Sequence, residues 1–263
     1  IAIRFTAERY AKFENIAIRE SSICVANSRA TRADFESRYN PPPNWDCEVV
    51  HWGVDTEMFR PLDIENEQEN RNFTEIRTRF GAVSPGSKLL LAVGRLAARK
   101  GYGTLIRGFS VLNKEMPNTK LVIVGRGHLK RRLMRLAKSL GVGEDITIES
   151  SLSFAELAQL YRSSDLVVYP SFYEGQGLIP LEAMASGVPV VTVDHGPLPE
   201  MVDESVGALF TMGNIESMVS VMKEVLKAGR KKGEKGRARV LQKFTYSGNA
   251  ESFENIYLEA INR

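Results

Sequence analysis

"KLLLAVG", residues 88–94, is a short apolar run that ends in glycine, and it opens the most regular part of the chain. A helical pattern over 104–115 follows, then a similar run, "KLVIVG" (120–125), and then a basic amphipathic pattern over 129–140. Apolar strands that alternate with helices predict a parallel sheet covered by helices on both faces, in a doubly wound α/β fold. The alternation predicts further strands at "DITIE" (145–149), "DLVVYP" (165–170), "VPVVTV" (188–193) and "VGALF" (206–210), and further helices from Ser153, over 178–186, and over 214–228, 230–243 and 249–261.

The segments before residue 88 are less regular. Residues 1–20 have a helical pattern, "SICVAN" (22–27) is typical of a short buried strand, and Ser28 is a good N-cap for the helix that follows. "NPPPNW" (40–45) predicts a stiff connector, because proline excludes both helix interiors and central strands. The polar, acidic residues 61–72 predict an exposed linker.

The composition indicates an ordinary globular protein of 263 residues, with 43% hydrophobic residues and a net charge of +3. This charge gives no argument for a nucleic-acid partner. The two cysteines, Cys24 and Cys47, are too few for a disulfide framework and lack metal-ligand spacing, so we expect reduced thiols and a cytoplasmic protein. No apolar run approaches the length of about 18 residues that a membrane-spanning helix needs, and no signal peptide is visible.

Basic residues are concentrated between Lys223 and Lys243. Such a run is most often a solvated helix face, and less often a surface that contacts anionic lipid. The residues are Lys223, Lys227, Arg230, Lys231, Lys232, Lys235, Arg237, Arg239 and Lys243.

Polar groups and glycines follow three strands that are neighbours in a doubly wound sheet. Gly94 and Arg95 follow the first strand, with Lys100 close behind, and Gly125 ends the second. The "EGQGL" turn (174–178) follows "DLVVYP". Because ligands of such sheets bind at the carboxyl ends of the strands, we expect these groups to face one crevice.

The chemistry that these residues suggest is diphosphate binding. The planar guanidinium of Arg95 can donate to two phosphate oxygens at once, and Lys100 supplies a single positive charge. Gly175 and Gly177 allow the backbone to approach a ligand closely. The helix predicted to start near Leu178 presents free N–H groups and the positive end of its dipole. Glu182, in the second turn, is placed to accept ribose hydroxyls, and Glu174 those of a second sugar. Taken singly, each residue has a plainer reading as a solvated charge or a turn glycine.

The same segments resemble the family-4 retaining glycosyltransferases of GT-B fold. They are "AVGRLAARKGYGTLIRGF" (92–109), "LVIVGRG" (121–127), "DLVVYPSFYEGQGLIPLEAMASGVPVV" (165–191), "LPEMVDESVGALF" (198–210) and, less closely, "VVHWGVDTEMFRP" (49–61). Glu174 and Glu182 match the E-x7-E motif of that family. The sequence departs from its pattern at Gln176, where phenylalanine is frequent, at Trp52, where asparagine is frequent, and at His195, where the family often has glycine.

The resemblance implies a role for each matching residue. Arg95 and Lys100 would hold the donor diphosphate, Glu174 would contact the sugar, and Glu182 would hold the ribose. The backbone at Gly175, Gln176, Gly177 and Leu178 would contact sugar and phosphate, with the nucleobase near Ser151 and Leu152. Neither metal nor other cofactor is expected, and the catalytic residues would be Arg95, Lys100 and Glu174.

The resemblance also implies a division of the chain. Residues 1–44 would be the remnant of an N-terminal Rossmann domain that binds the acceptor, 45–72 an interdomain linker, 73–245 the Rossmann-like donor-binding domain, and 246–263 a helix that returns to the first domain. The complete protein would be a retaining hexosyltransferase acting on a glycan or lipid-linked acceptor. The chain alone would bind donor, and turnover would need the rest of the N-terminal domain or a partner chain. Peripheral membrane contact would fit such an acceptor.

Three other functions compete with this interpretation. A sugar-nucleotide epimerase would share the fold, although the "EGQGLIPLEAMASG" pattern (174–187) argues against it. A non-catalytic module that binds nucleotide sugars remains open, since an acceptor half is not evident in the sequence. A dehydrogenase is disfavoured because G-x-G-x-x-G does not follow the first strand.

Overall fold

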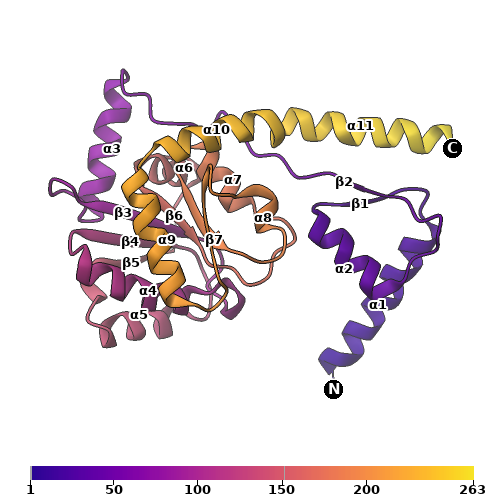
Figure 1. Ribbon diagram of the computed structural model, residues 1–263, viewed down its shortest axis with the longest axis horizontal. Helices are drawn as coiled ribbons and strands as arrows, with labels where there is room; N and C mark the ends of the chain where they lie inside the picture. The colour runs from indigo at the N-terminus through magenta and orange to yellow at the C-terminus, as the bar shows by residue number, and fades with distance from the viewer. Residues whose placement is uncertain (1, 151) are drawn as a thin grey trace.

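The larger part of the protein is a six-stranded parallel sheet. The computed structural model describes the backbone of residues 2–150 and 152–263, and side chains from residue 11 onward. The strands have the order β5-β4-β3-β6-β7-β8 (Figure 1). Their bounds are β3 (Lys88–Val93), β4 (Thr119–Val124), β5 (Ile146–Glu149), β6 (Leu166–Tyr169), β7 (Val190–Val193) and β8 (Gly207–Phe210). All the strands predicted from residue 88 onward are therefore confirmed.

Helices cover both faces of this sheet. One layer contains α4 (Tyr102–Glu115), α5 (Lys130–Ser139) and α9 (Ile215–Ala228), and the other contains α3 (Glu67–Arg79), α6 (Phe154–Ser163), α7 (Leu178–Ala185) and α10 (Lys231–Lys243) (Figure 1). The central strand β3 lies between the layers, and the side chains of Leu89, Leu90 and Leu91 are 0% exposed. Full burial of a leucine contributes about 1.5–3 kcal/mol. A strand buried on both faces needs a continuous apolar run, which explains the sequence pattern.

The chain reverses its direction across the sheet between β3 and β6. It moves outward from β3 through β4 to β5, then returns to β6 beside β3 and continues through β7 to β8. The register pairs Val93 with Val124, so β3 and β4 end side by side. The predicted doubly wound topology is confirmed, and its switch point lies between the loops that follow β3 and β6.

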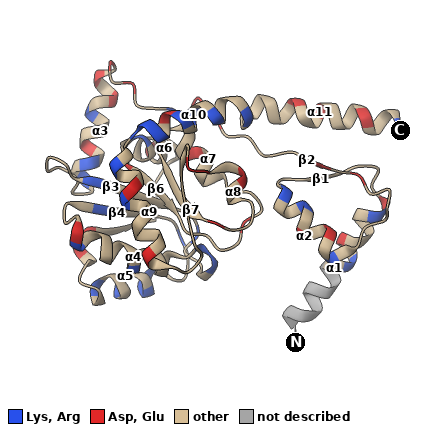
Figure 2. Cartoon of the chain, viewed as in Figure 1, with Lys and Arg blue, Asp and Glu red and all other residues tan. Residues whose placement is uncertain are grey.

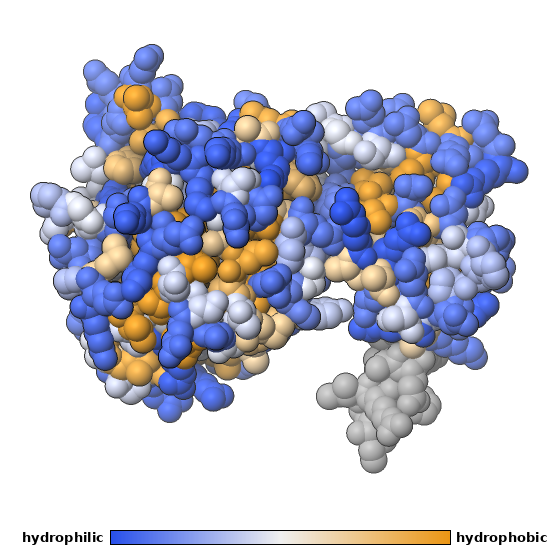
Figure 3. Space-filling view, viewed as in Figure 1, coloured by the Kyte–Doolittle hydropathy of each residue, from blue (hydrophilic) through white to orange (hydrophobic). Residues whose placement is uncertain are grey.

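A smaller part is built from the N-terminal residues. It contains α1 (Ala2–Glu20), β1 (Cys24–Ala26), α2 (Arg29–Tyr39) and β2 (Cys47–Val49), and the two strands form a parallel pair. The last helix, α11 (Tyr246–Asn262), leaves the large sheet and runs over this part (Figure 1). There the Arg263 guanidinium donates to the Ser22 carbonyl at 3.2 Å and pairs with Asp46. In the space-filling view the two parts join along a neck, with a hollow between them on one side (Figure 3).

Two chain segments cross the neck side by side. The N–H of Val54 donates to the Phe244 carbonyl at 2.9 Å, and Val54 forms a parallel bridge with Thr245. Gly53 permits this contact, because a Cβ atom there would lie 2.3 Å from the Thr245 carbonyl oxygen. The segment that enters the larger part, at Val54, is thus hydrogen-bonded to the segment that leaves it, at Phe244 and Thr245.

One helix lies partly inside the stretch expected as a linker. Residues 61–72 enter α3 at Glu67, where the Asn66 side chain accepts hydrogen bonds from the N–H groups of Gln68 and Glu69. Acidic residues in the first turn and arginines in the last complement the helix dipole. The linker prediction missed this helix because its residues are polar, although most of them are good helix formers. The short helices α8 (Leu198–Met201), η1 (Ala98–Lys100) and η2 (Gly143–Asp145) were not predicted either.

Much of the basic run proves to be structural. Side chains of Arg230, Lys232, Arg237 and Arg239 donate to the backbone carbonyls of Arg162, Gly207, Ala185 and Met201 respectively, at 3.0 to 3.1 Å. For these four side chains a solvated helix face is the wrong interpretation. Figure 2 shows the basic residues of α10 in blue. Within the described residues, no helix combines the length and apolarity required to span a membrane.

Candidate nucleotide-sugar site

An ion pair at the switch point joins two of the predicted site residues. Lys100 ends η1 after β3, and Glu174 lies in the loop after β6. The Lys100 ammonium also donates to the Tyr169 hydroxyl at 3.0 Å, and the Ser171 hydroxyl donates to the Glu174 carboxylate. Burial acts to raise the pKa of Glu174, but hydrogen bonds from Lys100, Ser171 and Tyr169 outweigh it and hold this pKa below its usual value.

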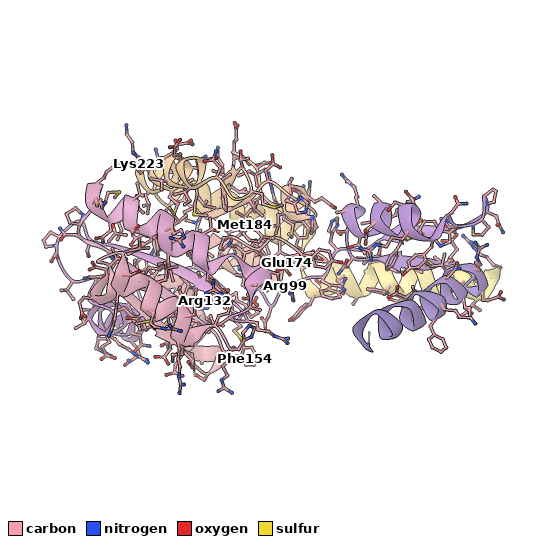
Figure 4. The ribbon with its side chains drawn as sticks, turned by 90° about the horizontal axis from the view of Figure 1, so that it is seen from below. Arg99, Arg132, Phe154, Glu174, Met184 and Lys223 are labelled. Carbon is pink, nitrogen blue, oxygen red and sulfur yellow. The ribbon has the colours of Figure 1, made fainter. Side chains whose placement is uncertain are left out.

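The two arginines of the same loop have different surroundings. Arg95 is exposed, and in the described part of the chain its side chain forms no hydrogen bond or ion pair, so it is free to reach a ligand. Arg99 donates to the Tyr173 carbonyl at 2.8 Å and lies 3.9 Å from the Glu174 carboxylate. Figure 4 shows Arg99 and Glu174 together at the end of the sheet that faces the smaller part. Arg99 was not among the predicted site residues, although its position beside Lys100 is a usable signal.

Glycines allow the loops after β3 and β4 to meet. A Cβ atom at Gly125 would lie 1.9 Å from the Gly94 carbonyl oxygen, and Gly94 itself has φ +137°. Any larger residue at position 125 would separate the two loops. Gly94 and Gly125 therefore have a packing role at this edge of the sheet.

The loop from Glu174 to Gly177 leads into α7 with its backbone donors open. Gly177 is the N-cap residue, with φ +111°, a conformation that favours glycine. Across residues 2–150 and 152–263, nothing accepts a hydrogen bond from the N–H groups of Gly175, Gln176, Gly177 or Leu178. Donors of this kind at a helix start suit a phosphate or a sugar oxygen. The Gln176 side chain, in contrast, is 2% exposed and turned toward the backbone of Trp52.

Glu182 lies in α7 behind this loop. Its carboxylate accepts a hydrogen bond of 2.7 Å from the hydroxyl of Tyr161, a fully buried residue of α6. Burial raises the pKa of Glu182, and the Tyr161 hydrogen bond only partly offsets that effect. Tyr161 orients the carboxylate, and nothing in the sequence pattern indicated this role.

The predicted nucleobase position is only partly defined. Ser151 lies outside the described residues, whereas Leu152 lines a cavity of about 310 Å³ between α3 and α6, together with Arg79 and Phe80. Neither Lys100 nor Glu174 lines this cavity. The preceding residue, Ser150, is held from the β4 side by Arg126 and Lys130, each at 2.7 Å.

A second cavity, of about 400 Å³, separates α2 from the large sheet. It borders the predicted site directly, since Glu174 and Gly175 form part of its wall, and it has a mixed polar and aromatic lining. Its other lining residues are Asn27, Ala30, Thr31, Asp34, Phe35, Tyr173, His195, Gly196 and Pro197.

Solved structures share this fold. Sucrose-phosphate synthase from Thermosynechococcus elongatus superimposes with a TM-score of 0.81 over 97% of this chain and 62% of its own, at 21% identity. Anabaena HepE, solved in complex with UDP and glucose, gives a TM-score of 0.81 over 93% of this chain and 65% of its own, at 20% identity. These neighbours establish a Rossmann-like fold that is shared with glycosyltransferases.

Sequence relatives agree with the structural neighbours. The D-inositol 3-phosphate glycosyltransferase of Segniliparus rotundus is 30% identical over 255 residues, 94% of this chain and 54% of the relative. A GDP-mannose-dependent alpha-(1-6)-phosphatidylinositol monomannoside mannosyltransferase of Mycolicibacterium smegmatis is 31% identical over 83% of this chain and 56% of the relative. The chain spans about half the length of these curated relatives. The family model "Glycosyl transferases group 1" matches residues 74–240, more than half of the chain, and the protein therefore belongs to that family.

Proposed function

We propose that this chain binds the nucleotide-diphospho sugar donor of a glycosyltransferase that transfers the sugar with retention of anomeric configuration. The observation that carries the proposal is the arrangement at the switch point. The Lys100–Glu174 pair lies beside the loop whose N–H groups are unpaired within the described chain, and Arg95 is exposed nearby. Cationic groups and backbone donors suit a diphosphate, and carboxylates suit sugar hydroxyls.

The same residues account for the chemistry of transfer. The bond between the anomeric carbon and the diphosphate oxygen breaks, and negative charge develops on the leaving diphosphate. Arg95, Lys100 and the start of α7 stabilise this charge electrostatically. The acceptor oxygen bonds to the carbon on the same face, and its proton passes to a diphosphate oxygen. Glu174 holds sugar hydroxyls and is not the nucleophile, since its carboxylate is engaged by Lys100 and Ser171.

Glu182 supplies the ribose contact in this proposal. Its carboxylate is partly buried, and within the described residues the Tyr161 hydroxyl is its one hydrogen-bond donor. Two vicinal hydroxyls of a ribose satisfy a carboxylate that has few other partners. The nucleobase then extends toward Leu152, and no metal or other cofactor is required by this scheme.

The acceptor and its location are proposed from the relatives. One relative is named for an inositol phosphate and another for a phosphatidylinositol mannoside, so a glycan or lipid-linked acceptor is the natural class. A cytoplasmic enzyme with peripheral membrane contact would reach such an acceptor. Residues 1–44 supply part of the acceptor domain, and the rest comes from further chain or from a partner.

Calorimetric titration of the chain with UDP, GDP and ADP, without added metal, tests donor binding. We expect one nucleotide to bind, and we expect Arg95→Ala to weaken binding at least tenfold by removing a charged contact. Arg135→Ala is the matched control, because Arg135 is an exposed arginine on α5. Unchanged binding by Arg95→Ala would contradict the assignment of Arg95. In an enzyme with both domains, the anomeric configuration of the product, read by NMR, decides between retention and inversion.

A further inference from the structure

Two hydroxyl groups of the smaller part hold a single carbonyl in the donor loop. The Gly175 carbonyl oxygen lies 2.6 Å from the Ser28 hydroxyl and 3.0 Å from the Thr31 hydroxyl, and it accepts from both. Ser28 is also the N-cap of α2, where its oxygen accepts from the Thr31 N–H at 3.0 Å. Its single hydroxyl therefore caps the helix and reaches the loop.

This contact fixes the orientation of one peptide group. A trans peptide is planar, with its C=O and N–H directed oppositely, and the described backbone contains no cis peptide bond. Because α2 holds the Gly175 carbonyl, the N–H of Gln176 points away from α2. That N–H is one of the donors at the start of α7 that nothing in the described chain satisfies.

The Gln176 side chain also holds the loop in place. The Gln176 side-chain oxygen accepts the Trp52 N–H at 2.6 Å, and its amide nitrogen donates to the Trp52 carbonyl at 3.0 Å. This two-way pairing resembles one rung of a β-ladder between the loop and the neck. The phenylalanine expected from the family pattern would offer neither bond.

The start of α2 and the residues near Trp52, which hold the loop, are themselves bonded to α8 of the larger part. The Glu200 carboxylate of α8 accepts from the N–H groups of Arg29 and Ala30, at 3.0 and 2.9 Å, and lies 3.0 Å from the His51 ring. A carboxylate at the first turn of α2 complements the helix dipole. The segments that hold the donor loop are thus tied back to the same domain as the loop.

We propose that Ser28, Thr31 and Gln176 are positioning residues that preset the Gly175–Gln176 peptide for the donor diphosphate or its sugar. We call these three residues the loop clamp. They touch the loop from the side of α2 and the neck, and they act on the ligand only through the loop backbone. The inference rests on the proposed function, because it presumes that the free N–H groups receive a nucleotide-diphospho sugar.

The test compares ligands with and without phosphates. Calorimetry gives the affinity of the chain for UDP, GDP or ADP, whichever binds, and ligand-observed NMR gives its affinity for the matching nucleoside. We expect Thr31→Val and Gln176→Met each to weaken diphosphate binding about three- to tenfold, the effect of one or two misplaced hydrogen bonds. Affinity for the nucleoside should stay within about twofold, because its contacts lie elsewhere.

Two control variants distinguish a change in the orientation of the Gly175–Gln176 peptide from a general loss of folding. Thr31→Ser keeps the hydroxyl and should restore diphosphate affinity. Ser37→Ala removes a hydroxyl on the same helix whose hydrogen bond, within the described residues, goes to the Asp34 carbonyl alone. Equal losses for diphosphate and nucleoside, or wild-type diphosphate affinity in Thr31→Val and Gln176→Met, would overturn the clamp. If the unchanged chain binds none of the three nucleotides, the proposed function itself fails and the clamp fails with it.

Discussion

The ammonium group of Lys100 and the carboxylate of Glu174 form an ion pair and neutralise each other. Their side chains are 10% and 12% exposed, and they come from loops 74 positions apart. The cation assigned to the diphosphate is thus already paired with the carboxylate assigned to the sugar. If the site binds donor as proposed, the diphosphate and the sugar share or exchange the partners of this pair.

Removing only one member of this pair should destabilise the protein. We expect Lys100→Met to lower the free energy of unfolding by about 3 kcal/mol, because it leaves Glu174 buried without its counter-charge. The double variant Lys100→Met/Glu174→Gln should recover most of that loss, and urea denaturation of the single and double variants measures the coupling. Additive losses would show that the two groups do not depend on each other.

The ionised Glu182 carboxylate should lower the free energy of unfolding at neutral pH. Folding raises its pKa through burial. A carboxyl group of this kind is most favourable to the folded state below its unfolded pKa, and its contribution declines as the pH rises through the folded pKa. Glu182→Gln should therefore leave Tm almost unchanged at pH 4 and raise it at pH 7, while weakening nucleotide binding. A lower Tm at pH 7 than the unchanged protein would contradict this account.

Arg237 should be essential to the docking of α10. One terminal nitrogen of its guanidinium lies 2.9 to 3.0 Å from the carbonyl oxygens of Thr56, Phe59 and Ala185. We expect Arg237→Ala to cost about 2–3 kcal/mol, since charged hydrogen bonds contribute most and the carbonyls lose their partner. Lys235→Ala, on the exposed face of the same helix, should change stability by less than about 0.5 kcal/mol. Similar losses in the two variants, measured by urea denaturation, would rule out a specific role for Arg237.

Cys47 should react slowly with thiol reagents. Burial, with the adjacent Cys24, raises the pKa of the Cys47 thiol to about 11. Only the thiolate reacts, so alkylation of Cys47 in a Cys24→Ser variant should accelerate about tenfold per pH unit between pH 7 and pH 9. Iodoacetamide labelling followed by mass spectrometry measures the rate. A rate that is independent of pH would mean that opening of the strand pair, and not ionisation, limits the reaction.

The sheet was predictable because its signals are local and redundant. Each buried strand, such as Lys88–Val93, is a continuous apolar run bounded by glycine or polar residues, and no helix of that composition would fit between two layers. The helix predicted from Ser153 begins there, and a capping box of Ser153 and Glu156 closes its first turn. That Lys100 and the loop of Glu174 face one crevice was predicted from strand-end geometry, because parallel strands bring their carboxyl ends to one edge. The ion pair between the two side chains was not predicted.

The unpredicted features depend on contacts between distant segments. Gln176 was expected to contribute its backbone alone, and nothing in the sequence shows that Trp52 lies within reach of its side chain. The Arg237 side chain is likewise indistinguishable in sequence from its solvated neighbour Lys235. The helix α3 was missed for a different reason, since its apolar residues Phe73 and Ile76 are too few to create a strong period.

The paired segments at Val54 and Thr245 determine how the two parts of the protein can move. A single flexible connection would permit rotation about any direction, whereas two segments bonded side by side resist twisting about the line that joins the parts. Bending across the pair leaves these bonds in place, although it must break the hydrogen bonds from Ser28 and Thr31 to the Gly175 carbonyl. Approach and withdrawal of α2 from the donor loop would then follow one arc, which returns Ser28 and Thr31 to the same carbonyl after each excursion.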